Sequence, residues 1–249
     1  MTSTRGSGAR TVMAETTTAA PAASIRRRSR YVRRFTFTER LLHWVHASAF
    51  FVLLGSGLIL YLPALSTTFA DRPLIKDIHF YTAVSWAGAM ALIALLGNRR
   101  AVLRTLREVD RFDRDDRRFL AGATRTPQGR FNAGQKVNVI VTAAFATLFF
   151  ISGMLLWLGE RNTDIRLGGT LYLHDALMYL SVVIVLGHLY LALIHRSTRH
   201  SLRGITLGTV REDWAIAHHS KWVSAPPAAA APDSVQALPA LAAEPAPPS

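Results

Sequence analysis

The chain has no cysteine among its 249 residues. Disulfide frameworks, thiolate zinc sites, iron–sulfur ligation and covalent c-type haem attachment all require cysteine, so the sequence excludes them. Acidic residues are also few, 16 against 29 lysines and arginines, which gives a formal net charge of +13. Because the basic residues lie between apolar runs, and not on one face of a polar domain, we expect a membrane protein and no nucleic-acid partner.

Long apolar segments, by contrast, are plentiful. Four runs, 41–62, 78–97, 137–158 and 171–194, each contain 20 to 24 residues. At ~1.5 Å per residue, each run can cross a hydrocarbon core of roughly 30 Å as a helix. The sequence therefore predicts an all-α membrane protein, a four-transmembrane-helix bundle, with no apparent internal repeat.

The two ends of the chain differ from its middle. Residues 1–32 are rich in Ala, Thr, Ser and Arg, and residues 224–249 are rich in Ala and Pro. Neither segment can bury enough apolar surface to offset its chain entropy. We expect a disordered basic extension and a disordered tail on either side of one helical domain at 33–223.

Lysines and arginines flank the four runs unevenly. Residues 1–40 carry nine and 98–136 carry eleven, against two each in 63–77 and 159–170, while the segment from His195 onward carries five. By the positive-inside rule both termini and the basic loop 98–136 are cytoplasmic, and the two short loops face outward. Within that basic loop, 112–120 alternates Asp and Arg, which indicates a solvated or headgroup-facing surface.

Ionisable side chains at membrane depth usually mark function. Five of the nine histidines lie inside the runs: His43, His46, His79, His174 and His188. His174 and His188 are fourteen residues apart, which on a helix is about 40° short of four turns, so both face one side with ~21 Å between them. One metal ion cannot bridge that distance, whereas two sites at two depths can use both residues.

The predicted orientation supplies a partner for each of these two histidines. His79 lies at the outer level with His174, and His43 lies at the inner level with His188. Zinc prefers three or four ligands, whereas two facing imidazoles suit haem b with an electron-transfer role. Two alternatives stay open: histidines that only hydrogen-bond between helices, and His46 in place of His43 as the inner ligand.

The other histidines lie outside the apolar runs. His195 falls at the membrane edge, where a headgroup role is expected. Three more lie in polar sequence, and we expect them on the surface: His200, His218 and His219. Asp175, an acid inside the fourth run, either tunes the neighbouring His174 or lies at the membrane interface.

Several short motifs resemble those of one known family, the dihaem cytochrome b, or gamma, subunits of respiratory formate dehydrogenases. The matching stretches span about residues 33–223 in the expected order: Arg40-Leu-Leu-His43-Trp44, Ile78-His79-Phe80, Asn132-Ala-Gly-Gln-Lys136, His174…His188 followed by Leu189-Tyr190, and Trp214…His218-His219-Ser-Lys-Trp222. The long N-terminal extension and the Ala/Pro-rich tail depart from the family pattern.

The resemblance implies two haems b in a dihaem cytochrome b domain at 33–223. Their iron ligands would be two pairs of histidines: His43 with His188 for the inner haem, and His79 with His174 for the outer haem. The chain would hold no formate-oxidising site and no catalytic residue of its own. Its partners would be an iron–sulfur beta subunit and a molybdenum or tungsten alpha subunit.

The same resemblance implies a quinone, either menaquinone or ubiquinone, beside the inner haem. Asn132 and Gly134 match the positions near the quinone carbonyl, and Gln135 is a further candidate. An amide side chain and a backbone N–H exposed by glycine are suitable donors to a carbonyl oxygen. The alternative for this motif is a glycine-assisted turn or helix start.

These implications describe a quinone-reducing subunit of a formate dehydrogenase, multi-pass in the bacterial inner (plasma) membrane. The same architecture could instead serve a nickel–iron hydrogenase or a thiosulfate-type reductase. A histidine-using divalent metal transporter and a haem-free assembly anchor are alternatives from other classes. A transporter should show carboxylates in mid-membrane, and Asp175 is the only acid well inside a run.

Overall fold

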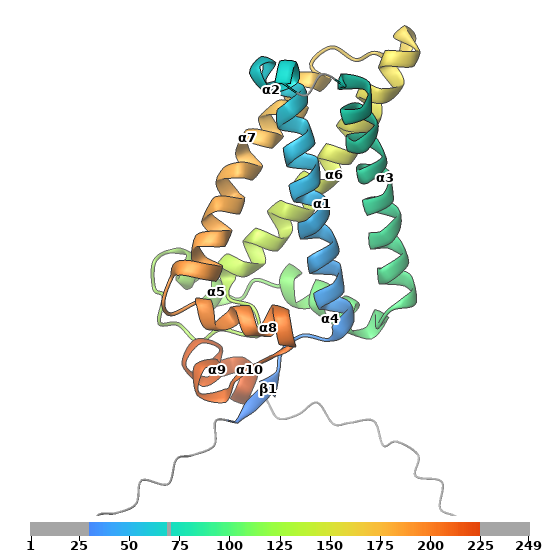
Figure 1. The fold of residues 1–249 in the computed structure, drawn as a ribbon. Coiled ribbons are helices and arrows are strands. Elements are labelled where there is room, and N and C mark those ends of the chain that lie inside the picture. The colour runs from blue at the N-terminus through green and yellow to red at the C-terminus, as the bar shows by residue number, and fades with distance from the viewer. Residues whose placement is uncertain (1–29, 69–70, 225–249) are drawn as a thin grey trace, which may run out of the picture.

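The computed structural model describes residues 30–68 and 71–224. Four long helices form its body (Figure 1): α1 (Phe37–Tyr61), α3 (Arg72–Leu96), α6 (Ala133–Arg161) and α7 (Thr170–Leu189), which continues as a π-helical turn, η2 (Tyr190–Ile194). All four are long and apolar enough to cross a membrane. The predicted all-α membrane bundle of four helices is confirmed.

Three of the long helices begin several residues before the apolar runs that predicted them. α1, α3 and α6 start four to six residues earlier, because a polar residue caps each first turn. Thr36, Asp71 and Asn132 each accept a hydrogen bond from the backbone N–H three residues further on. Apolar composition marks the membrane span, whereas capping marks where the helix starts.

The short elements gather at the two ends of the bundle (Figure 1). At one end lie α2 (Pro63–Thr68) and η1 (Thr163–Ile165). The opposite end holds the other short elements: β1 (Tyr31–Arg33), β2 (Thr209–Arg211), α4 (Arg99–Asp110), α5 (Arg114–Leu120), η3 (Arg199–Ser201), α8 (Leu202–Leu207), α9 (Glu212–His218) and α10 (Ser220–Ser224). We call this second end the basic end, because residues 98–136 lie there with their eleven basic side chains.

Residues 98–136, expected as a loop, are largely helical because α4 and α5 lie within them. We predict that 112–120 forms a solvated or headgroup-facing surface, and this prediction is wrong for Asp116, which is buried. Asp116 is 2% exposed and pairs with Lys136 at 2.6 Å. In a helix, neighbouring residues point in different directions, so α5 turns this acid inward and leaves its arginines exposed.

The described fold begins before residue 33, the predicted start of the helical domain, because strand β1 begins at Tyr31. Val32 lies opposite Val210 in an antiparallel pair of strands. A three-residue strand with polar neighbours gives almost no apolar signal, which is why the predicted boundary falls inside it. Residues 1–29 and 225–249, for which we predict disorder, lie outside the described residues.

The long helices pack as two hairpins, α1 with α3 and α6 with α7. They bury few of their large apolar side chains, as expected for helices surrounded by lipid. The buried apolar core lies instead at the basic end, around Val210, Trp214 and Ala215. The space between the two hairpins is therefore not filled by an ordinary protein core.

Candidate functional site

Each histidine of α7 faces a histidine from another helix. Near the start of α7, His174 faces His79 of α3, with ring centroids 6.2 Å apart. Near its end, His188 faces His43 of α1, with centroids 6.3 Å apart. We call these couples the outer pair and the inner pair, after the predicted orientation. The fold thus brings together the same partners that the predicted orientation supplied.

The separation in both pairs suits one metal ion between two imidazoles. A metal–nitrogen bond of ~2 Å on each side, plus ~1 Å from each nitrogen to its ring centre, places two trans rings roughly 6 Å apart. The pairs are separated by ~21 Å of helix rise along α7, so one metal ion could not bind to both. Two imidazoles with no thiolate are the ligand set of a bis-histidine haem.

A buried serine from the neighbouring helix contacts each histidine of the outer pair. His79 Nδ1 lies 2.9 Å from Ser56 Oγ, and His174 Nδ1 lies 2.8 Å from Ser152 Oγ. With Nδ1 engaged, Nε2 is the ring nitrogen left for a metal ion. Sequence reasoning missed both serines, because a serine within an apolar run carries no signal of what it faces.

A glycine follows each of these serines and lets the imidazole lie close to the helix. A Cβ atom on Gly57 would lie 3.4 Å from Cε1 of His79, and one on Gly153 would lie 3.5 Å from Cε1 of His174. A methyl group at either position would therefore already be in van der Waals contact with the ring. The two hairpins therefore repeat one local arrangement, serine, glycine and facing histidine, although no repeat is apparent in the sequence.

A cavity of about 1280 Å³ opens between the hairpins around the outer pair. His79 and His174 line it, and all four long helices contribute apolar walls, among them Leu53 and Met154. Asp175 also lines this cavity. An apolar cavity of this size beside two facing imidazoles fits a flat macrocycle. The inner pair lies outside this cavity.

His46 faces a different neighbour from His43. Its ring lies 5.7 Å from that of Trp86 on α3, whereas the ring of His43 faces His188. Three residues along a helix leave ~60° between side-chain directions, which is enough to separate the two roles. The geometry favours His43 over His46 as the inner ligand.

His219 is buried, so the predicted surface position is wrong. Its side chain is 1% exposed; Nδ1 donates to the carbonyl of Gly129 at 2.6 Å, and Nε2 accepts from Arg34 at 3.2 Å. Burial, reinforced by the Arg34 guanidinium, lowers the pKa of His219 to about 3. The ring is therefore neutral at physiological pH.

The other histidines at the basic end are closer to their expected positions. His200 is exposed. His218 is half-buried and stacks on Trp214, with ring centroids 4.9 Å apart. His195 is half-buried, and its Nδ1 lies 3.0 Å from Thr198 Oγ1 in the turn after η2.

The segment Asn132–Lys136 starts α6, as the alternative interpretation of this motif anticipates. Asn132 and Gln135 form a capping box in which each side chain accepts from the other's backbone N–H. Ala133 is fully buried, and Lys136 forms its buried ion pair. Gly134 is exposed, and its N–H has no acceptor among the described residues. The motif is thus a rigid helix start with one free backbone donor.

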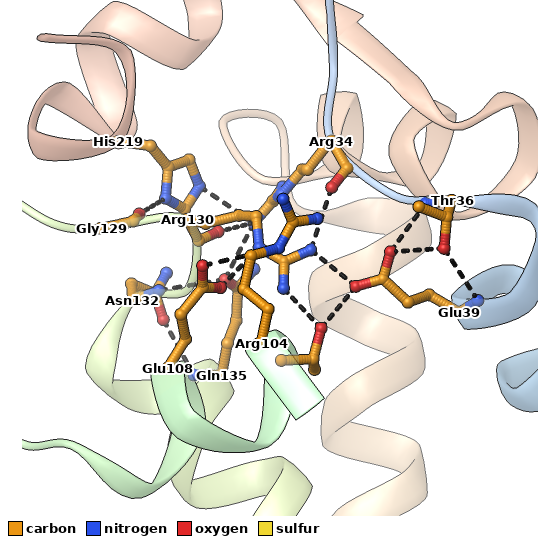
Figure 2. A network of polar contacts seen from close by, with 11 residues as sticks. Arg34, Thr36, Glu39, Arg104, Glu108, Gly129, Arg130, Asn132, Gln135 and His219 are labelled. Atoms are coloured by element: carbon orange, nitrogen blue, oxygen red, sulfur yellow. Dashed lines mark hydrogen bonds and ion pairs between the residues drawn. The ribbon is translucent and has the colours of Figure 1, made fainter. Parts of the chain in front are cut away.

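A polar network fastens this helix start to the first turn of α1 (Figure 2). Arg130 donates to Glu39 at 2.8 Å and to Glu108 at 2.6 Å. Arg34 donates to the side-chain oxygen of Gln135 at 3.1 Å. Burial, together with the charge of Arg130, lowers the pKa of Arg34 to about 9, which leaves it charged near neutral pH. We call Arg34, Glu39, Glu108, Arg130 and His219 the anchoring network.

The anchoring network lies close to the inner pair along α1. Glu39 precedes His43 by four residues, one helical turn or ~6 Å of rise, and therefore shares its face. Sequence reasoning treated these arginines only as positive-inside charges. The available signal was Glu39, an acid just before the first apolar run, because a buried carboxylate requires a partner.

In the part of the chain that the structure describes, histidines, aspartates and glutamates do not form a larger metal-binding group. Within residues 30–68 and 71–224, no three of these side chains are placed to hold one metal ion. The described part of the chain therefore offers pairs of imidazoles, and not the three or four ligands that zinc prefers.

Comparison with known proteins gives consistent results. The formate dehydrogenase cytochrome b556(fdo) subunit of Escherichia coli K12 is 25% identical over 197 residues, covering 76% of this chain and 90% of that protein. The nitrate-inducible formate dehydrogenase cytochrome b556(Fdn) subunit of the same strain is 20% identical over 207 residues, covering 78% of this chain and 91% of that protein. The putative cytochrome YdhU of that strain is 28% identical over 187 residues, covering 68% of this chain and 70% of that protein.

These relatives confirm the predicted resemblance to formate dehydrogenase cytochrome b subunits. The family model described as prokaryotic cytochrome b561 matches residues 34–208, more than half of the chain. The match includes both histidine pairs, both serines and the start of α6. With four apolar helices and paired imidazoles inside the matched range, this chain belongs to the prokaryotic cytochrome b561 family.

Proposed function

We propose that this chain is the membrane electron-transfer subunit of a formate dehydrogenase, carrying electrons through two bis-histidine haems b to a quinone on the cytoplasmic side. The observation that carries the proposal is the presence of two facing imidazole pairs at opposite ends of α7, with centroids 6.2 and 6.3 Å apart. Relatives named as formate dehydrogenase cytochrome subunits support the choice of complex.

The residues present fit haem b, which membership of a cytochrome b family implies. His79 and His174 would hold one haem, and His43 and His188 the other. When bound, each haem would supply a one-electron carrier. The chain's own part is to hold the imidazoles at the required separation and to surround the outer site with apolar walls.

The start of α6 supports quinone binding near the inner pair. The amide nitrogen of Asn132 and the backbone N–H of Gly134 are donors suited to a quinone carbonyl and to the negative charge that develops on it. Gln135 already accepts from Asn132 N and from Arg34. We therefore assign Gln135 to positioning the helix start, with Asn132 and Gly134 as the contacts.

Charge distribution supports an orientation with the basic end in the cytoplasm. Both described ends of the chain and the segment 98–136 lie at that end of the bundle (Figure 1). Electrons would then enter at the outer pair and leave at the inner pair, with protons for the quinone taken from the cytoplasm. We infer that an iron–sulfur beta subunit delivers the electrons and that a molybdenum or tungsten alpha subunit oxidises formate, since this chain has no cysteine with which to ligate an iron–sulfur cluster itself.

The second candidate is the same dihaem architecture with another donor, a nickel–iron hydrogenase or a thiosulfate-type reductase. The relative named only as a putative cytochrome, 28% identical, is compatible with both candidates, because its name states no donor. The two candidates share every feature of this chain described above and differ in the partner alone.

The test is a dithionite-reduced minus oxidised visible spectrum of the purified chain, with a pyridine haemochrome assay for haem per polypeptide. We expect two haems b, falling to one in His79→Ala or His174→Ala. Co-purification with formate-reducible iron–sulfur protein distinguishes formate dehydrogenase from the second candidate. A folded chain without haem absorbance would falsify the electron-transfer proposal.

A further inference from the structure

The serines that contact the outer pair also bond to their own helices, in the same way in both hairpins. Ser56 Oγ lies 2.8 Å from the carbonyl oxygen of Val52, and Ser152 Oγ lies 2.7 Å from that of Leu148. Both carbonyls are four residues before their serine, so each hydroxyl sits between a backbone acceptor and a histidine ring. The repetition in two hairpins makes a chance contact a poor explanation.

The proton positions follow from this arrangement. A carbonyl oxygen can only accept, so the single hydroxyl proton of each serine is directed to the backbone. The serine oxygen is then the acceptor, and the ring nitrogen Nδ1 of His79 or His174 carries the proton that it donates. This tautomer leaves the lone pair of Nε2 available for a metal ion.

The inner pair is built differently. Among the described residues, neither His43 nor His188 has a side-chain or backbone partner for its ring nitrogens within hydrogen-bond distance. The inner imidazoles therefore have no counterpart of the serine contacts among the described residues, whereas both outer imidazoles donate into a two-step chain of hydrogen bonds that ends on a carbonyl.

We propose that Ser56 and Ser152 are positioning residues that lower the reduction potential of the outer haem relative to the inner one. The inference rests on the proposed function, since it requires a haem between each pair. An imidazole that donates from Nδ1 becomes a more basic ligand through Nε2 and stabilises the more positive, oxidised iron. The second bond, from the hydroxyl to the carbonyl, strengthens the first.

This asymmetry has a functional consequence. A lower potential at the outer pair and a higher one at the inner pair favour passage of each electron from the outer haem to the inner one. The order agrees with electrons entering from an outer partner and leaving to a quinone beside the basic end.

The experiment is a spectroelectrochemical redox titration of the purified full chain, which resolves two one-electron transitions. We expect the outer haem of the wild type to have the lower midpoint potential. Ser56→Ala and Ser152→Ala should each raise that midpoint, and the double variant should raise it further, while the inner transition does not move. The g values of the oxidised haems in electron paramagnetic resonance should shift for the outer haem only.

Two control variants separate the hydrogen bond from general packing. Ser56→Thr and Ser152→Thr keep a hydroxyl, so we expect potentials near the wild type. Thr147→Ala removes a hydroxyl of α6 that bonds to the carbonyl of Ala143, at 2.9 Å, and that does not line the cavity around the outer pair. It should leave both transitions unchanged.

The possible outcomes distinguish this inference from the proposed function. Two haems with unchanged midpoints in both alanine variants would overturn the serine role and leave the dihaem proposal standing. A wild-type chain without haem would overturn both. Loss of the outer haem in the alanine variants, with retention in the threonine variants, supports the role of the hydroxyls in holding the ligands.

Discussion

Arg34 and Arg130 each donate a hydrogen bond from the guanidinium to the other residue's backbone carbonyl, at 2.7 and 3.1 Å. These reciprocal bonds join the segment before α1 to the segment before α6, 96 residues further along the chain. Both arginines are almost completely buried. They fix the position of the helix start that carries Asn132 and Gly134, relative to the helix that carries His43.

We therefore expect Arg34→Lys to impair quinone reduction while leaving both haems in place. Lysine keeps the charge but cannot reproduce the several directed bonds of a guanidinium, so the helix start loses its anchor. Oxidation of the dithionite-reduced chain by a soluble quinone analogue should slow by about tenfold, equivalent to roughly 1.4 kcal/mol. The exposed neighbour Arg33, changed to Lys, provides the control and should react at the wild-type rate.

The buried ion pair of Glu39 and Arg130 should be important for stability. Their side chains are 6% and 3% exposed, and removing one partner of such a pair typically costs ~3–5 kcal/mol. For Glu39→Gln we expect the free energy of unfolding to fall by about 3 kcal/mol. This is the low end of that range, because Glu108 still faces Arg130. Thermal denaturation of the detergent-solubilised protein measures the loss.

A surface pair provides the comparison for this variant. Arg211 and Asp213 form an exposed ion pair, and such pairs add little to stability because water and salt screen them. Asp213→Asn should leave the melting temperature unchanged. If the melting temperature fell equally in the two variants, burial of the Glu39–Arg130 pair would have no special effect on stability.

His219 should make the fold sensitive to acid. Its pKa is lowered to about 3 in the folded chain, against ~6.5 when unfolded. Below pH ~6.5 the unfolded state binds a proton that the folded state does not, so stability falls as the pH decreases toward 3 by up to about 1.4 kcal/mol per pH unit. Above pH ~7 this contribution is constant.

The pH dependence of the melting temperature between pH 7 and 4.5 checks this expectation. His219→Gln has no titrating ring and keeps both a donor for Gly129 and an acceptor for Arg34. This variant should lose less stability than the wild type over that range. Parallel curves for the two proteins would rule out His219 as the group responsible.

Alanine variants of His43 and His46 should differ clearly in their haem content. Because the ring of His43 faces His188, whereas that of His46 faces Trp86, His43→Ala should lose the inner haem and His46→Ala should keep both. The pyridine haemochrome assay counts them. If His46→Ala instead lost one haem and His43→Ala lost none, our choice of inner ligand would be wrong.

Much of the fold could be predicted because membrane helices have strong local signals. Length and hydropathy are properties of one segment, and they located all four spans to within a few residues of their ends. The phase of His174 and His188 is also a property of one helix, so fourteen residues of spacing were enough to infer two sites. Short polar elements such as β1 and α5 have no comparable signal, and their positions emerged only from the structure.

The sequence by itself determined the number of spans, the two depths at which histidines occur and the uneven distribution of positive charge. Only the tertiary structure decided what each polar side chain contacts: Ser56 with His79, Ser152 with His174, Arg34 with Arg130, and His43, not His46, with His188. The physical reason is that periodicity describes one helix about its own axis. A contact between helices depends on their relative rotation and depth, which are set when the helices pack.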